Sequence, residues 1–175
     1  PGHPLHRLDV AQAPDPLRQL PDDSVRAVLW RFARLDALQR LVKASREVAR
    51  GPVAGLVASG ERQRQDWTSG KDALLRSFDA AGVNLVGLDV EHGGSAEGTR
   101  NLAMALAAFE LAWVDGGAAT TALANYLAVS PLRECGTPEQ RAFYMTASSV
   151  PQGDTGAPWR GAFALTEPIP YAGVE

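Results

Sequence analysis

Residues 161–168 read Gly-Ala-Phe-Ala-Leu-Thr-Glu-Pro, and this stretch decides how the rest of the chain is interpreted. Small, aromatic and apolar residues lead into a polar Thr-Glu pair, a pattern that predicts a short buried strand. Proline has no amide hydrogen for a central ladder, so the strand is expected to end before Pro168. Such a strand would bring the Thr166 hydroxyl and several backbone amides to a ligand. The helices upstream would form one wall of the ligand pocket.

Upstream of this stretch, apolar residues recur at helical spacing. The pattern predicts helices over 22–50, 53–64, 71–81, 97–114, 118–130 and 138–145. Gly51-Pro52 is expected to break the first of these, Gly82 to end the helix over 71–81, and Pro131 to start a new segment. Thr137 is expected to cap the helix over 138–145, with Gln140 three residues on, and 159–165 is the first strand-like segment. The segment 97–114 is apolar almost all round, interrupted only by Glu110, and is expected to be the buried central helix.

The order of these segments predicts the fold class and the domains. The fold is expected to be mainly α, with the start of a β domain at the C-terminal end. The predicted organisation is an extended Pro-rich segment over 1–21, a helical domain over 22–146, a loop over 147–158 and a truncated β domain over 159–175.

Composition excludes several function classes. The 175 residues carry a net charge of −3, with 45% hydrophobic and 21% charged residues, so no general field favours nucleic acid or an anionic membrane. The arginines of 26–50 and 60–64 alternate with acids and indicate solvated helix faces. No stretch reaches the roughly 20 apolar residues of a membrane span, and no signal peptide is visible. Cys135 is the sole cysteine, which excludes an internal disulfide, and is expected to be a small core residue rather than a nucleophile. No metal site is expected, and His3 and His6 are expected to be inert.

Five segments resemble, in order, motifs of the acyl-CoA dehydrogenase family. Residues 74–83 resemble its helix that ends in Gly and an apolar connector, and 89–94 (Asp-Val-Glu-His-Gly-Gly) resemble its Pro-Glu-Glu-Tyr-Gly-Gly. Residues 109–112 (Phe-Glu-Leu-Ala) resemble its Glu-Glu-Leu-Ala, and 136–140 (Gly-Thr-Pro-Glu-Gln) resemble its Gly-Thr-Glu-Glu-Gln. Residues 163–168 resemble the strand that begins its flavin-binding β domain. Each motif is weak alone, but five in order over about a hundred residues are a specific signal, whereas 1–70 match less well.

The resemblance implies an FAD-dependent acyl-CoA dehydrogenase that oxidises the α,β bond of an acyl-CoA thioester. In such enzymes a glutamate of a C-terminal helical domain takes the α-proton and a hydride passes to the flavin. That base is expected beyond Glu175, so no catalytic residue is assigned here. The chain is expected to be the N-terminal portion of a longer polypeptide that is not competent alone. The resemblance places these residues beside FAD: Phe163, Ala164, Leu165, Thr166 and Gly173. Without the other motifs, Thr166 would be read as a residue that caps a turn after a buried strand.

This chain departs from the family pattern at several positions. Residues 169–175 lack the usual Gly-Ala-Gly-Ser-Asp, so the phosphate-side contacts are in doubt and Gly173 would stand in for a family glycine. His92 replaces a tyrosine and is expected to pack in a loop. Glu110 is expected to be a structural acid, with a place near the acyl channel as the alternative, and the Ala-rich helices of 105–128 are expected to line that channel.

Two function classes stay open at this point. The first is the dehydrogenase, or an acyl-CoA oxidase that uses O₂ as acceptor; the second is a non-catalytic docking or assembly module derived from the same fold. For the enzyme, the resemblance implies an acyl-CoA substrate, an electron-transfer flavoprotein or similar acceptor and a homo-oligomer. A cytoplasmic location is expected, with the mitochondrial matrix as the alternative.

Overall fold

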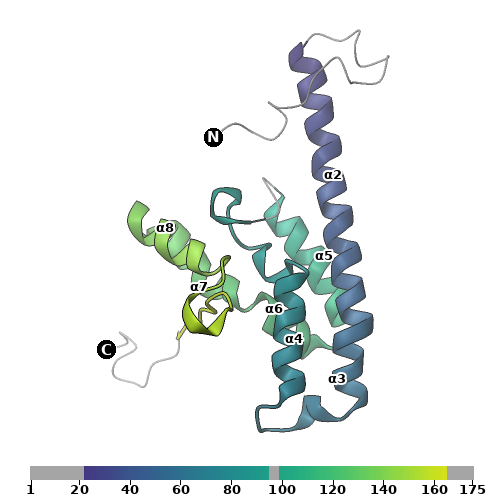
Figure 1. Ribbon diagram of the computed structural model, residues 1–175. Coiled ribbons are helices and arrows are strands. Elements are labelled where there is room, and N and C mark those ends of the chain that lie inside the picture. Colours follow the sequence, from purple (N-terminus) through teal and green to yellow (C-terminus); the bar gives the residue numbers. More distant parts are fainter. Residues whose placement is uncertain (1–21, 95–98, 165–175) are drawn as a thin grey trace, which may run out of the picture. The chain divides into compact units, whose positions relative to one another are not determined.

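The computed structural model describes residues 22–94 and 99–164, with the side chains of these ranges except for 22–34 and Thr155. Chain contacts divide the protein into two compact units, residues 1–40 and 41–175. Helices occupy all the segments expected from the sequence, although the single helix expected over 118–130 is divided in two at Ala124, and the described residues contain no strand. In chain order the α-helices are α2 (Asp22–Val48), α3 (Ala54–Ala58), α4 (Ser69–Ala80), α5 (Arg100–Ala112), α6 (Gly116–Leu123), α7 (Asn125–Cys135) and α8 (Pro138–Ala147) (Figure 1).

The expected break at Gly51-Pro52 is absent, because a π-helix over Ala49–Val53 connects α2 to α3. Pro52 has no amide hydrogen to donate four residues back. The helical turn instead contains one extra residue, and the Ala54 amide donates to the Ala49 carbonyl five residues earlier. The predicted helix over 53–64 is also shorter than expected, since α3 ends at Ala58 and only a 3₁₀ turn follows at Glu61–Gln63.

Helix α4 begins and ends at residues with local signals. The Thr68 side chain accepts a hydrogen bond from the Lys71 amide and caps the first turn. Gly82 follows the helix with a φ of 67°, the left-handed conformation that terminates helices. The buried face of α4 carries Leu74 and Phe78, and Phe78 is fully buried.

Helix α5 is buried on one face only, so the expectation of an all-round buried helix was wrong. Its buried residues are Ala103, Ala107 and Leu111, spaced at four-residue steps along one stripe. This stripe packs on α6, whose buried residues are also small: Ala118, Ala119 and Ala122. The opposite face of α5 exposes large side chains, including Phe109 at 62% and Trp113 at 75%.

The helices α7 and α8 enclose a second part of the core. Leu88, from the connector after α4, packs with Val129 of α7 and Met145 of α8. Pro131 does not start a new segment but lies inside α7. Helix α8 starts as expected, with a capping box in which the Thr137 and Gln140 side chains each bond to the other residue's amide. Cys135 ends α7 at an exposed position, so it is not a core residue.

The predicted strand over 159–165 is not formed in its described part, residues 159–164. A strand needs a partner strand for its amides, and within the described residues the chain offers only one isolated bridge, Gln152 to Ala157. The amides of Trp159 and Gly161 bond to the helical region instead, at the Ala147 carbonyl and the Asn125 side chain. Phe163 is correspondingly 48% exposed rather than buried.

Candidate functional site

The candidate site lies at the end of the described chain, where residues 159–164 pass over α7 and α8. Phe163 and Ala164, two of the residues predicted to contact FAD, are both exposed there. Their backbone and the Phe163 ring are therefore available to a ligand and are not used by the core of the chain. The other three predicted contacts, Leu165, Thr166 and Gly173, lie outside the described residues.

Three consecutive residues attach this segment to three different helices. The Trp159 amide donates to the Ala147 carbonyl of α8 at 2.9 Å. The Arg160 Nη2 lies 2.7 and 2.8 Å from the two carboxylate oxygens of Asp79 in α4. The Gly161 amide donates to the buried Asn125 side chain, at the start of α7, at 2.6 Å. We call residues 159–161 the anchor segment.

A pocket of about 420 Å³ adjoins the anchor segment. Its walls carry the rings of Tyr144 and Trp159, whose centroids lie 6.4 Å apart and at 5.0 and 5.7 Å from the Phe143 ring. This size and this apolar, aromatic lining are typical of small-molecule sites. The residues around the pocket come from α7, α8 and the anchor segment: Asn125, Ala128, Val129, Leu132, Tyr144, Met145, Ser148, Trp159, Arg160 and Gly161.

The loop over 89–94 is held by a network centred on Asp89. One Asp89 carboxylate oxygen accepts from Arg100 of α5, and the other accepts from the Arg133 Nε of α7 at 3.1 Å. The same Arg133 guanidinium donates to the Gly87 carbonyl and lies 5.7 Å from the centre of the Tyr126 ring. Asp89 therefore joins the loop to two helices that are distant in sequence.

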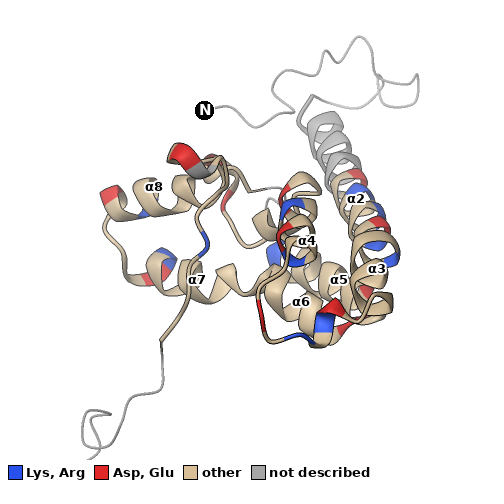
Figure 2. Ribbon diagram, turned by 60° about the horizontal axis from the view of Figure 1, so that its bottom comes forward, with Lys and Arg blue, Asp and Glu red and all other residues tan. Residues whose placement is uncertain are grey.

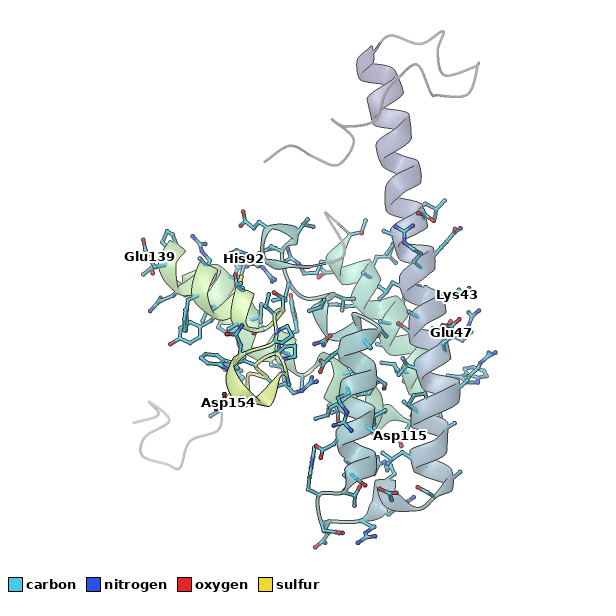
Figure 3. The ribbon with its side chains drawn as sticks, in the orientation of Figure 1. Lys43, Glu47, His92, Asp115, Glu139 and Asp154 are labelled. Carbon is cyan, nitrogen blue, oxygen red and sulfur yellow. The ribbon has the colours of Figure 1, made fainter. Side chains whose placement is uncertain are left out.

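The surroundings and backbone conformation of His92, Gly93 and Gly94 explain the residue types in the rest of this loop. The His92 side chain is 12% exposed and lies beside α8 (Figure 3), in agreement with the expected packing role. Gly93 has a φ of 95°, a conformation that favours glycine. A Cβ on Gly94 would overlap the Leu88 carbonyl, so this position leaves no room for any side chain.

Comparison with known families agrees with this geometry. The family model described as "Acyl-CoA dehydrogenase, N-terminal domain" matches residues 36–148, more than half of the chain. The chain belongs to the acyl-CoA dehydrogenase family. The match contains four of the five motifs and begins well before residue 71, where the resemblance was expected to start. No curated protein and no solved structure matches the chain.

Three further findings on the described residues of this acyl-CoA dehydrogenase domain concern membranes, metal ions and a second pocket. None of its described helices is long and apolar enough to cross a membrane. Among the same residues, no group of three His, Cys, Asp or Glu side chains is arranged to hold a metal ion. A further pocket of about 300 Å³ lies between α3, α4 and α6, with the Arg62–Asp115 ion pair (2.9 Å) at its edge.

The charged side chains of the domain form mixed pairs rather than one basic surface. Figure 2 shows acidic and basic positions interspersed along the described helices. Four of the described arginines in the basic stretches are paired: Arg40 with Asp36, Arg46 with Glu110, Arg62 with Asp115 and Arg64 with Asp66. On α2, Lys43 and Glu47 also lie next to one another (Figure 3). The interpretation as solvated helix faces is confirmed for these residues.

The alanines of α5 and α6 serve helix packing. Because Ala103, Ala107, Ala118 and Ala122 are buried where the two helices meet, their small side chains allow the helices to approach closely. The expected acyl channel along 105–128 stays a prediction. The exposed face of this region carries Leu127, which is 55% exposed.

Glu110 has the structural role that the sequence indicated. Its side chain is 12% exposed and accepts two hydrogen bonds from Arg46 of α2, at 2.9 Å from Nε and 2.7 Å from Nη2. These bonds to the Arg46 guanidinium hold the pKa of Glu110 below its ordinary value of 4.5. Glu110 is thus ionised at neutral pH, and both of its carboxylate oxygens accept hydrogen bonds from Arg46.

We expect the Arg46–Glu110 pair to give the domain an acid-sensitive contribution to stability. Because the pKa of Glu110 is lower in the folded state, the contribution is present above pH 4.5 and is lost as the pH falls through the folded pKa. Glu110→Gln should lower the free energy of unfolding by about 1 kcal/mol at pH 7, since Arg46 is half exposed. Urea titrations at pH 7 and pH 3 should show the gap between variant and wild type closing at pH 3. A gap of equal size at both pH values would contradict this assignment.

Sequence reasoning missed the residues that hold the site together. Asp79 and Asn125 are polar residues in ordinary helical contexts that no local pattern marks, and the 89–94 motif that begins at Asp89 gives no sign of its arginine partners. Their partners Arg160, Gly161 and Arg133 lie 81, 36 and 44 residues away. Only the folded chain brings them together.

Proposed function

We propose that this chain supplies the helical wall of an FAD-dependent acyl-CoA dehydrogenase that acts on the α,β bond of an acyl-CoA thioester. The family match over 36–148 carries the proposal. Two features of the structure are consistent with it. The segment that leads into the predicted flavin contacts is anchored to three helices, and Phe163 and Ala164 are exposed at its end.

The residues present fit the cofactor in their chemistry. The segment that contains Phe163 and Ala164 has backbone amides and a Phe163 side chain that is 48% exposed. Thr166 adds a hydroxyl donor two positions further on. FAD, when bound, supplies the hydride acceptor of the reaction. The chain's own contribution is to position that cofactor and to give it hydrogen-bond donors that need no rearrangement during the reaction.

The other roles proposed for the enzyme lie partly outside this chain. The α-proton would be taken by a glutamate beyond Glu175. The acyl chain would lie along the exposed face of α6 and α7, which includes Leu127. An electron-transfer flavoprotein or similar acceptor would receive the electrons, and the enzyme would be a homo-oligomer.

The purified full-length polypeptide tests this proposal. We expect bound FAD, visible in the absorbance spectrum, and reduction of an electron acceptor that depends on added acyl-CoA. No activity with acyl-CoA of any chain length, despite bound FAD, would contradict the proposal. A well-folded preparation without FAD would favour the docking module, and peroxide formation from O₂ would favour the oxidase.

We expect Thr166→Ala to lower kcat about tenfold while FAD remains bound, because one donor to the cofactor is lost and the rest of the segment is kept. Thr146→Ala is the matched control, since Thr146 is an exposed threonine on α8. Steady-state kinetics of both variants give the comparison. Equal rates for both variants would remove Thr166 from the site.

A further inference from the structure

We infer that the anchor segment, residues 159–161, is a positioning device that fixes Phe163 and Ala164, two of the predicted flavin contacts, on the helical domain and thereby sets FAD affinity and reduction potential. The inference rests on the proposed function for its cofactor. Its structural part, that three contacts fix the path of residues 163 and 164, stands on the described residues alone.

The first argument is the convergence of the contacts. Three successive residues bond to α8, α4 and α7, and each bond has a different kind of acceptor: a backbone carbonyl, a carboxylate and a side-chain amide oxygen. Trp159 uses its amide and Arg160 its guanidinium, while Gly161 donates its amide to a side chain. A segment held at one point can pivot, but a segment held at three consecutive residues by separate helices has one direction of exit. Phe163 follows only two residues later.

The second argument is the quality of the Arg160 contact. Its Nη2 reaches both oxygens of Asp79 and lies 3.2 Å from the Leu75 carbonyl, near the end of α4. The two side chains are only 29% and 18% exposed, so water screens the pair less than an ordinary surface pair. Asp79 is itself oriented by the Asn84 amide group at 2.8 Å. The acceptor for Arg160 is therefore set in place by the domain.

The third argument is the close approach of Gly161 to α7. An added Cβ on Gly161 would overlap the Cβ of Ala128, and its next neighbour would be the Asn125 Oδ1 at 3.2 Å. Asn125 is 6% exposed and accepts the Gly161 amide at 2.6 Å. Both the missing side chain of Gly161 and the small side chain of Ala128 are needed for this bond to form. The backbone thus lies against α7 at this one point.

A steric exchange between these two positions tests the inference. Gly161→Ala should push the segment away from α7, and the double variant Gly161→Ala/Ala128→Gly should restore the space. Ala128→Gly alone is the control, because it weakens the helix without filling the contact. Arg160→Gln removes the charged contact with α4 separately, and Arg160→Lys, which keeps one positively charged nitrogen as the donor, should rescue it in part.

Two measurements are independent of catalysis. Amide hydrogen exchange should become at least tenfold faster at Trp159 and Gly161 in Gly161→Ala and return toward wild type in the double variant. Backbone order parameters of Phe163 and Ala164 should fall from near 0.8 to below about 0.6 in Gly161→Ala. Unchanged exchange and order parameters in Gly161→Ala, or no recovery in the double variant, would overturn the inference.

The cofactor measurements address its consequence. FAD affinity should fall about tenfold in Gly161→Ala and Arg160→Gln, with a shift of the reduction potential, and both should recover in the double and Lys variants. Amide exchange and order parameters could change as expected while FAD affinity and the reduction potential do not. The anchor segment would then not act on the cofactor, and the inference would fail in that part. If the wild type binds no FAD, the proposed function fails, and exchange and order parameters alone decide whether the anchor fixes the segment.

Discussion

Phe78→Ala should lower the free energy of unfolding by about 3–5 kcal/mol, the largest loss expected from a single substitution in the described chain. Phe78 is fully buried on the inner face of α4. Truncation removes a whole aromatic ring from the core and leaves a cavity that neighbouring helices fill only in part. A loss of this size equals a large share of the stability of an ordinary domain. Urea or guanidinium titration of the purified protein, followed by far-UV circular dichroism, measures it.

Phe109→Ala is the matched control for this prediction. Phe109 belongs to a helix of the same protein but is 62% exposed, next to Trp113 at a ring-centroid distance of 6.1 Å. Its truncation removes little buried area, so we expect a loss below about 1 kcal/mol. Equal losses for the two variants would mean that α5 is buried on both faces, as its sequence alone had indicated, and that the one-sided burial described above is wrong.

This comparison shows where sequence patterning was sufficient and where it was not. Capping at Thr137 and termination at Gly82 depend on interactions within a few residues, and both were predicted at the correct positions. The burial of α5 depends on which neighbours cover it. An apolar helix gives no local signal of the face that stays uncovered, so the exposure of Phe109 could not be derived from periodicity.

The two prolines failed as helix breakers for a related reason. Proline removes one amide donor, and the sequence rule assumes that the helix cannot absorb the loss. At Pro52 the chain absorbs it with a π turn, and at Pro131 the helix α7 continues through the residue. Pro52 and Pro131 are themselves exposed, whereas Val53 and Val129 close to them are buried. The burial of these neighbours holds each helix in place around its proline, and it depends on tertiary contacts that are not visible in the sequence.

The candidate site was likewise predicted only in part from the sequence. Residues 163 and 164 were predicted as cofactor contacts from the motif alone, and the structure places them at an exposed end of the segment. Nothing in the motif indicated that Asp79 and Asn125 would fix that segment, because the contacts span 81 and 36 residues. The assignment of all five predicted contacts to FAD stays a prediction until the cofactor measurements above are made.

Asp89→Asn should lower the free energy of unfolding by about 2–3 kcal/mol, the second of the two large effects on stability. The Asp89 side chain is 27% exposed and balances two guanidinium groups, Arg100 and Arg133, of which Arg133 is 13% exposed. Asparagine keeps one oxygen for one arginine but turns an amide donor toward the other. A largely buried cation without its carboxylate costs more than the loss of an exposed pair.

Asp66→Asn provides the control, because it breaks an Asp–Arg pair of the same kind at the surface. Arg64 donates to both oxygens of Asp66 at 3.0 and 2.6 Å, but both side chains are more than half exposed. We expect a much smaller loss of stability there than for Asp89→Asn, since water and salt replace the partner. Denaturant titrations of both variants at 0.05 and 0.5 M NaCl separate the cases: salt should shrink the Asp66 effect and leave most of the Asp89 effect. If both effects were small and equally sensitive to salt, Asp89 would be a solvated surface acid, and the loop over 89–94 would need another explanation for its fixed contacts with α5 and α7.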